Sequence, residues 1–119
     1  MSMRDISRKY RLNQSKQEHD ARTHSIFLHP KLIGLEDIIM STDEVNMFKR
    51  DYNLFHQPDN LMFDYEHFRI YNIEYKLNGN REKAIKQLRE TRMYLRRMFR
   101  NYDIVNLYIH NNYKVEEIK

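Results

Sequence analysis

Hydrophobic residues recur every three or four positions through much of the chain after residue 40, which is the spacing of an amphipathic helix. The segment Ser41-Thr42-Asp43-Glu44 matches a capping box, in which the serine side chain and Glu44 satisfy the first free amides of a helix. An apolar stripe follows it: Val45, Phe48, Tyr52 and Phe55. We therefore predict a helix that begins at Ser41 and is stopped by Pro58.

A second helix is predicted from Pro58-Asp59-Asn60, because an acidic or amide residue next to a proline is a common helix start. Its stripe is Leu61, Tyr65, Phe68, Asn72 and Tyr75. The break Asn78-Gly79-Asn80 should end this helix near Leu77. Phe68 is expected to be a buried residue of the core.

A third helix is predicted directly after Asn80. Its apolar stripe is Ala84, Leu88, Thr91, Leu95 and Met98, and basic residues occupy much of the remaining surface. The segment from Ile104 to Ile109 is rich in β-branched and aromatic residues, so that it is either a short strand or the tail of a helix. The polar end from Lys114 to Lys119 is expected to be frayed.

The first 24 residues contain few apolar side chains without a sustained helical period, and we interpret residues 1–24 as an arm that docks on a partner. An irregular connector containing Pro30 and Gly34 follows it. Only 2 glycines and 2 prolines occur in 119 residues, which leaves little turn chemistry for hairpins. The fold class predicted is all-α, a small helical domain (residues 25–119) of three or four short helices with an extended N-terminal arm.

The charge of the chain is +4, with basic residues near both ends and acidic residues between them. This distribution suits an acidic and basic protein partner at least as well as nucleic acid. The third helix could contact phosphates through arginines while Tyr94 or Phe99 stacks on a base. We favour a structural interpretation, in which both aromatic residues belong to the core and the arginines of the helix are solvated or paired. These arginines are Arg89, Arg92, Arg96, Arg97 and Arg100.

The sequence offers no recognisable catalytic, cofactor-binding or metal-binding residues. It has no cysteine, and none of its 6 histidines forms the i, i+4 pair with which one helix binds a metal. Neighbouring acids such as Asp43 and Glu44 are expected to lie in water or to cap a helix. There is no glycine-rich phosphate loop and no nucleophile motif. We therefore expect a protein that is not an enzyme.

Four short motifs nevertheless occur in an order that resembles a known family. They are Lys31-Leu32-Ile33-Gly34-Leu35-Glu36-Asp37-Ile38-Ile39, Pro58-Asp59-Asn60-Leu61, His67-Phe68-Arg69-Ile70 and Arg92-Met93-Tyr94-Leu95. Together they resemble the ubiquinol–cytochrome c reductase binding protein family, the small helical matrix-side subunit of respiratory complex III. The positions that match the family motifs are Leu32, Gly34, Leu35, Asp37, Pro58, Phe68, Arg69, Ile70, Tyr94 and Leu95.

This resemblance implies a non-catalytic structural and assembly subunit of complex III that supports electron transport. Its partners would be cytochrome b and the core subunits, with anionic lipid as a further contact and no nucleic acid. It would be peripheral on the matrix side of the mitochondrial inner membrane and hold no cofactor of its own. An acid such as Asp43 or Glu44 would be nearest to the proton entry route discussed for the family. The alternative function is a basic helical nucleic-acid-binding module.

Overall fold

The protein is an α/β fold built around one mixed β-sheet, not the all-α domain predicted from the sequence. The computed structural model describes residues 3–36, 38, 40–43, 47–48, 54–56, 58–77 and 80–119. Along the chain the elements are α1 (Met3–Leu28), the short helix η1 (Pro30–Ile33), β1 (Met40–Asp43), β2 (Met47–Phe48), β3 (Leu54–His56), β4 (Asn60–Asp64), β5 (Arg69–Lys76), α2 (Arg81–Met98), β6 (Asp103–His110) and β7 (Lys114–Ile118).

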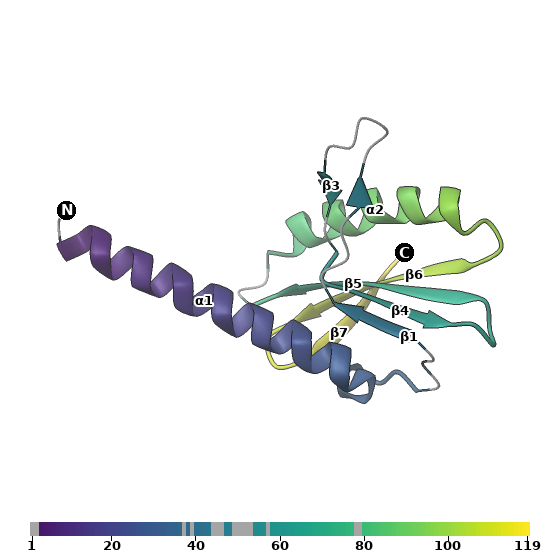
Figure 1. The fold of residues 1–119 in the computed structure, drawn as a ribbon, viewed down its shortest axis with the longest axis horizontal. Coiled ribbons are helices and arrows are strands. Elements are labelled where there is room, and N and C mark those ends of the chain that lie inside the picture. The colour runs from purple at the N-terminus through teal and green to yellow at the C-terminus, as the bar shows by residue number, and fades with distance from the viewer. Residues whose placement is uncertain are drawn as a thin grey trace.

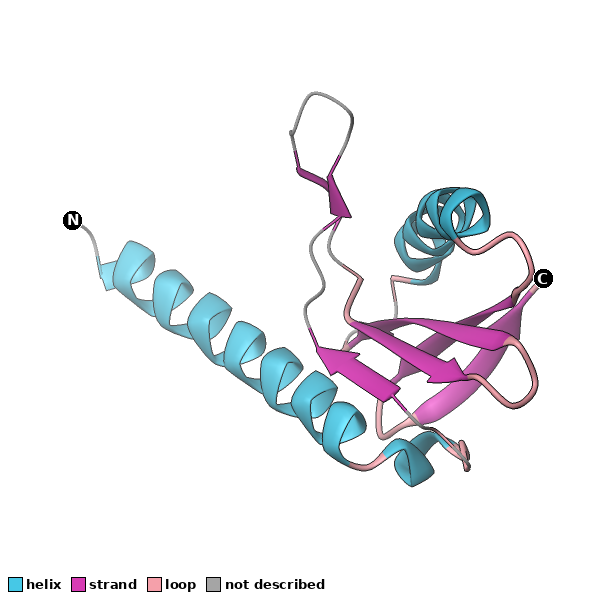
Figure 2. Ribbon diagram, turned by 45° about the vertical axis from the view of Figure 1, so that its right-hand side comes forward, coloured by secondary structure: helices cyan, strands magenta, loops and turns pink. Residues whose placement is uncertain are grey.

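The sheet has five strands in the order β1-β4-β5-β6-β7. Neighbouring strands are antiparallel except for β5 and β6, which are parallel and therefore need the crossover that α2 provides. Helices α1 and α2 lie on opposite sides of the sheet, and α1 extends well beyond it towards the N-terminus (Figure 1). Strands β2 and β3 form a separate antiparallel hairpin that projects from the sheet (Figure 2).

Each face of the sheet has its own core. On the α1 side, Ile26 of α1 and Ile33 of η1 pack against strand residues from β4 to β6: Met62, Ile73, Tyr75, Leu107 and Ile109. On the α2 side, Leu95 packs with Leu61, Phe63 and Ile70, while Ala84 and Leu88 pack with Tyr108 and Ile118. The central strands are thus buried on both faces, as expected for strands covered by helices on two sides.

Burial of the central strands on both faces explains why the prediction of a helix over residues 58–77 is wrong. A strand buried on both sides carries apolar residues without polar alternation, and some of them fall at helical spacings by chance. The tyrosine and isoleucine content of β5 was the signal for a strand. Phe68, expected in the core, lies in the turn between β4 and β5 and is 57% exposed.

The predicted capping box at Ser41 is also wrong, because residues 40–43 form strand β1. The hydroxyl of Thr42 donates to the carbonyl oxygen of Leu61 and accepts from the Leu61 amide, so that it joins two strands. Glu44, Val45 and Tyr52 lie outside the described residues, whereas Phe48 belongs to β2 and Phe55 to β3. Of the two acids that the family resemblance placed nearest to a proton entry route, Asp43 is a residue of β1, and Glu44 is outside the described residues.

The third predicted helix is confirmed as α2. The side chain of Asn80 accepts a hydrogen bond from the Lys83 amide and caps it, and the stripe from Ala84 to Leu95 is buried. Met98, assigned to the stripe, is 59% exposed. Residues 104–109 adopt the strand alternative within β6, and the tail expected to be frayed forms β7.

Helix α1 runs through the boundary that we predicted between the arm and the domain. Thr23 is 2% exposed and Ile26 is fully buried, so the last turns of α1 belong to the packed part of the molecule. The short helix η1 ends at Gly34, whose positive φ of 79° is a conformation that glycine adopts without steric cost. The connector expected around Pro30 and Gly34 thus consists of η1 and the turn at Gly34.

Candidate active site

Two acidic residues face each other at the end of the sheet where β4 begins and β5 ends. Asp59 immediately precedes β4, and the register pairs Asn60 with Ile73. The next opposed positions along this antiparallel pair are therefore Asp59 and Glu74. Glu74 and Lys76 are two positions apart on β5 and hence share the face covered by α2, because side chains alternate along a strand.

The side chains of Asp59 and Glu74 are largely withdrawn from water. Glu74 is 2% exposed, and the side chain of Asp59 is 15% exposed. Burial opposes ionisation of Asp59, but hydrogen bonds from His19, the Tyr75 amide and Glu74, with the charge of His19, lower its pKa below the usual range.

His19 reaches this pair from α1. Its Nε2 lies 3.0 Å from the Tyr75 carbonyl oxygen and 3.4 Å from Oδ2 of Asp59, and its Nδ1 lies 3.3 Å from Asp20. The hydrogen bond to Asp59 raises the pKa of His19 to about 9, against the effect of partial burial. The imidazolium is therefore charged at neutral pH and balances the buried carboxylate. In this way α1 is tied to the end of β5 by a polar contact as well as by Ile26.

The backbone amide of Tyr75 holds the Asp59 side chain in place. This amide donates to Oδ2 of Asp59 over 2.7 Å. The same oxygen lies 3.4 Å from Nε2 of His19. Lys76, the last residue of β5, is partly buried and makes no ion pair with any residue that the structure describes.

An amide from α2 adds a polar atom without a partner on the same face of the sheet. The side chain of Asn72 donates to the Leu88 carbonyl oxygen, which brings the middle of α2 over β5. Gln87 precedes Leu88 and lies on the same flank of α2 as Tyr94. Tyr94 packs on the core that includes Leu61 of β4, so this flank faces β4. Oε1 of Gln87 is buried and has no hydrogen-bond partner among the described residues. A buried polar atom of this kind calls for an explanation, such as a ligand.

The two carboxyl groups at this end of the sheet are donors of the kind that magnesium uses. Within the described ranges, no group of three or more His, Cys, Asp or Glu residues is placed to hold a metal ion. Magnesium, however, keeps several waters and is held in proteins by one or two carboxylates together with phosphate oxygens of the substrate. The carboxyl groups of Asp59 and Glu74 are such a pair.

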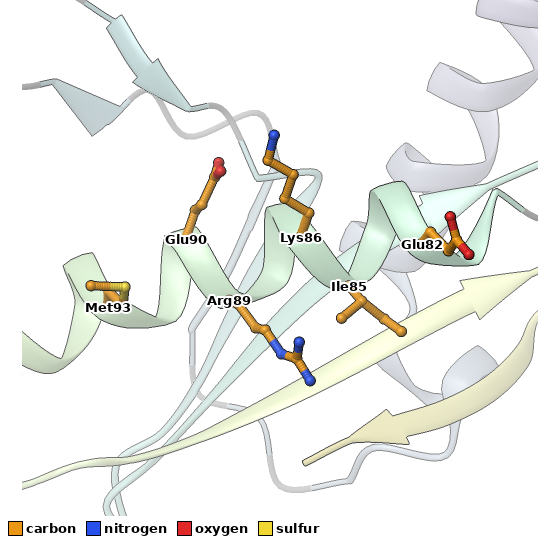
Figure 3. A pocket seen from close by; sticks show the side chains of 6 residues that line it. All are labelled: Glu82, Ile85, Lys86, Arg89, Glu90 and Met93. Carbon is orange, nitrogen blue, oxygen red and sulfur yellow. The ribbon is translucent and has the colours of Figure 1, made fainter.

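A surface depression on the outer side of α2 does not form a comparable site. It is lined by Glu82, Ile85, Lys86, Arg89, Glu90 and Met93. Figure 3 shows that Lys86 and Glu90 point one way from the helix while Ile85 and Arg89 point the other way. These side chains do not converge on a common point, so that we assign no chemistry to them.

The ten positions selected from the family resemblance do not come together in one site. Leu32 is 44% exposed, Gly34 and Leu35 follow η1, and Asp37 lies outside the described residues. Pro58 is buried before β4, and Arg69 donates to the Tyr71 hydroxyl at the start of β5. Ile70, Tyr94 and Leu95 belong to the core under α2, which confirms the structural interpretation of Tyr94. The subunit function implied by the resemblance stays a prediction, but the helical fold that it implied is wrong.

The residues of the candidate site escaped the sequence analysis because Asp59 and Glu74 both fall within the one helix predicted from Pro58 to Leu77. On a helix 15 residues separate them by four turns, whereas a hairpin brings them opposite each other. The signal was the pair Glu74 and Lys76 on a segment rich in strand-forming residues, since i and i+2 share a face only in a strand.

A search of family models, curated proteins and solved structures finds no match for this chain.

Proposed function

We propose that this protein is a magnesium-dependent hydrolase of phosphodiester bonds that acts on nucleic acid. The observation that carries the proposal is the buried carboxyl pair Asp59 and Glu74, with Lys76 on the same face of β5. Paired carboxylates that hold divalent metal are the common basis of phosphoryl hydrolysis in proteins. A lysine next to them supplies a cation for the charge that develops on the phosphate.

The residues divide the chemistry between them. Asp59 and Glu74 would hold the metal ion, which when bound would supply a Lewis acid for the phosphate and a water of lowered pKa. In the hydrolysis a water oxygen bonds to phosphorus, one ester P–O bond breaks, the water gives up a proton and the leaving oxygen takes one up. Lys76 neutralises charge on the phosphate oxygens in the transition state, and the amide of Tyr75 keeps Asp59 oriented. Gln87 would offer its buried Oε1 as a hydrogen-bond acceptor to a water at this site.

Nucleic acid is the substrate class that suits the charge of the chain. The protein carries +4 and has a sequence pI of about 9.3, in spite of the acidic residues in its centre. A positive surface attracts a polyanion and raises its rate of encounter. Eight basic residues lie between Arg81 and Arg100, in α2 and the turn that follows it.

The first experiment compares Glu74→Gln with the wild type. Fluorescein-labelled single-stranded and double-stranded oligonucleotides are incubated with each protein in magnesium, in manganese and in EDTA, and the products are separated on a denaturing gel. We expect metal-dependent cleavage by the wild type and a fall of at least about 100-fold in Glu74→Gln, because a ligand to the metal is lost. Lys76→Met should fall similarly without weakening the binding of the metal.

Glu66→Gln is the matched control, since Glu66 is exposed in the turn between β4 and β5 and far along β5 from the carboxyl pair. It should cleave at the wild-type rate. Circular dichroism shows whether each variant is folded, and the change in melting temperature on adding manganese measures metal binding apart from cleavage. Absence of metal-dependent cleavage by the folded wild type, or equal rates for Glu74→Gln and Glu66→Gln, would contradict the proposal.

A further inference from the structure

At the opposite end of the sheet, three arginines and two aromatic residues surround a pocket. Arg92 and Arg96 of α2 and Arg100 after it line this pocket, together with Phe99, Tyr102, Asp103 and Ile104. Asp103 is the one acidic residue among those that line it. Because Arg92 and Arg96 are four residues apart, they project from one side of the helix, and Arg100 follows in the turn after it.

Among the residues that the structure describes, the arginines of this pocket have no ion-pair partner that would explain their position. None of the three forms an ion pair with a residue that the structure describes. Nε of Arg92 is buried and has no hydrogen-bond partner in the described part of the chain. A buried guanidinium nitrogen without an acceptor is costly, and a phosphate oxygen is the acceptor that matches its geometry.

An exposed aromatic surface adjoins the pocket. The ring of Tyr102 contacts the rings of Phe99, Tyr65 and Phe68 at centroid distances of 5.8, 6.3 and 5.7 Å. Phe68 is 57% exposed and Tyr65 is 39% exposed. Phe99 instead packs against the core, so that the rings open to a ligand are those of the β4–β5 turn.

Phe68 is held in this exposed position against its local preferences. Its φ of 50° is unfavourable for a bulky side chain, and the carbonyl oxygen of Phe68 accepts from the Asp103 amide over 2.8 Å. This hydrogen bond fixes the turn beside the start of β6, where the pocket lies. A strained residue that presents an apolar ring to solvent points to a binding role.

We infer that this end of the molecule binds a nucleotide of a nucleic-acid strand, with its phosphate on Arg92, Arg96 and Arg100 and its base stacked on Phe68. The combination of cationic groups with exposed aromatic rings is the chemistry that holds single-stranded nucleic acid. The inference rests on the proposed function for the identity of the ligand.

The pocket and the carboxyl pair lie at opposite ends of the sheet. Ile104 pairs with Ile70 and Tyr108 pairs with Glu74, so four residues of β6 separate the level of the pocket from that of the carboxyl pair. At roughly 3.3 Å per residue this is about 13 Å. Leu88 and Leu95 of α2 pack on the face of the sheet between these levels, so a nucleic-acid strand held in the pocket does not cross that face.

Binding without catalysis tests this inference. Fluorescence anisotropy of a labelled oligothymidylate of about 12 nucleotides is measured in EDTA over a series of salt concentrations. We expect Arg96→Gln/Arg100→Gln to weaken binding at least about tenfold and to reduce the slope of log affinity against log salt by about 1.4, because two phosphate contacts are lost. Phe68→Leu should weaken binding at least about fivefold through loss of stacking.

Arg89→Gln/Arg97→Gln is the matched control, because it removes the same charge from exposed positions of α2 outside the pocket. Its affinity should stay within about threefold of the wild type, as expected for loss of long-range attraction alone. Equal weakening by the two double variants would overturn the inference, as would binding of phosphatidylserine vesicles that depends on the pocket while oligonucleotide binding does not. Since metal is absent, failure of the cleavage proposal leaves this measurement unaffected.

Discussion

At the scale of single residues, Phe68 and Asp64 have roles set by the turn between β4 and β5. Asp64, the last residue of β4, is 4% exposed and accepts hydrogen bonds from the amide and from Nδ1 of His67, at 3.2 and 2.7 Å. Asp103 donates its amide to Phe68 at the other end of the turn. The turn is therefore closed by polar contacts on both sides, and the ring of Phe68 projects between them.

Phe68→Ala should change the free energy of unfolding by less than about 1 kcal/mol, because an exposed ring contributes little to the core. A core phenylalanine would cost about 3–5 kcal/mol. Urea unfolding followed by circular dichroism distinguishes the two values. A large loss would mean that Phe68 supports the fold, and the binding role proposed for its ring would then need another explanation.

Asp64→Asn should destabilise the protein in a pH-dependent manner. Burial raises the pKa of Asp64, but the hydrogen bonds from His67 outweigh it and lower the pKa below its ordinary value. A carboxyl group with a lowered pKa in the folded state adds stability above its unfolded pKa of about 3.9, and this stability is lost as the pH falls through the folded value. The difference from the wild type in urea unfolding should be larger at pH 7 than at pH 3, whereas exposed Glu66→Gln should show little difference at either pH.

At the scale of elements, α1 and α2 serve the sheet in different ways. Helix α2 covers its face with a stripe of small and aliphatic residues and provides the crossover between the parallel strands. Helix α1 is attached mainly through its last turns, by Ile26 in the core, by the Asn60 side chain that donates to the Thr23 carbonyl oxygen, and by His19 at the carboxyl pair. Its C-terminal half therefore helps to build the candidate active site.

Ile26→Ala should lower the free energy of unfolding by about 2–5 kcal/mol, because a fully buried side chain of α1 leaves a cavity against Ile73 and Tyr75. Leu28→Ala on the same helix should cost less than about 0.5 kcal/mol, since Leu28 is 54% exposed. Urea titrations of both variants give the comparison. Similar values for the two would show that α1 is not anchored as the structure indicates.

At the scale of the whole molecule, two chemistries occupy the two ends of the sheet. Carboxyl groups with a lysine lie where β5 ends, and arginines with aromatic rings lie where β6 begins. The sheet sets the distance between them, because β5 and β6 run parallel and in fixed register.

The sequence alone determined those features that depend on neighbours along the chain. Helix α2 follows from a capping asparagine and a stripe at Ala84, Leu88, Thr91 and Leu95, because both signals are local. The break at Gly34 follows from the freedom of glycine at positive φ. The core position of Tyr94 could likewise be inferred from its place beside the stripe.

Only the tertiary structure decided the sheet and the site that it builds. Residues 60–77 form a hairpin rather than a helix because α1 and α2, which are distant in sequence, cover the two faces of its strands. The spacing of apolar residues along the chain does not reveal burial on two faces. The meeting of Asp59 with Glu74 and of Phe68 with Tyr102 requires that hairpin and its register. Pairing of two strands brings residues that are distant in the sequence into contact. For this reason the candidate site could be recognised only in the tertiary structure.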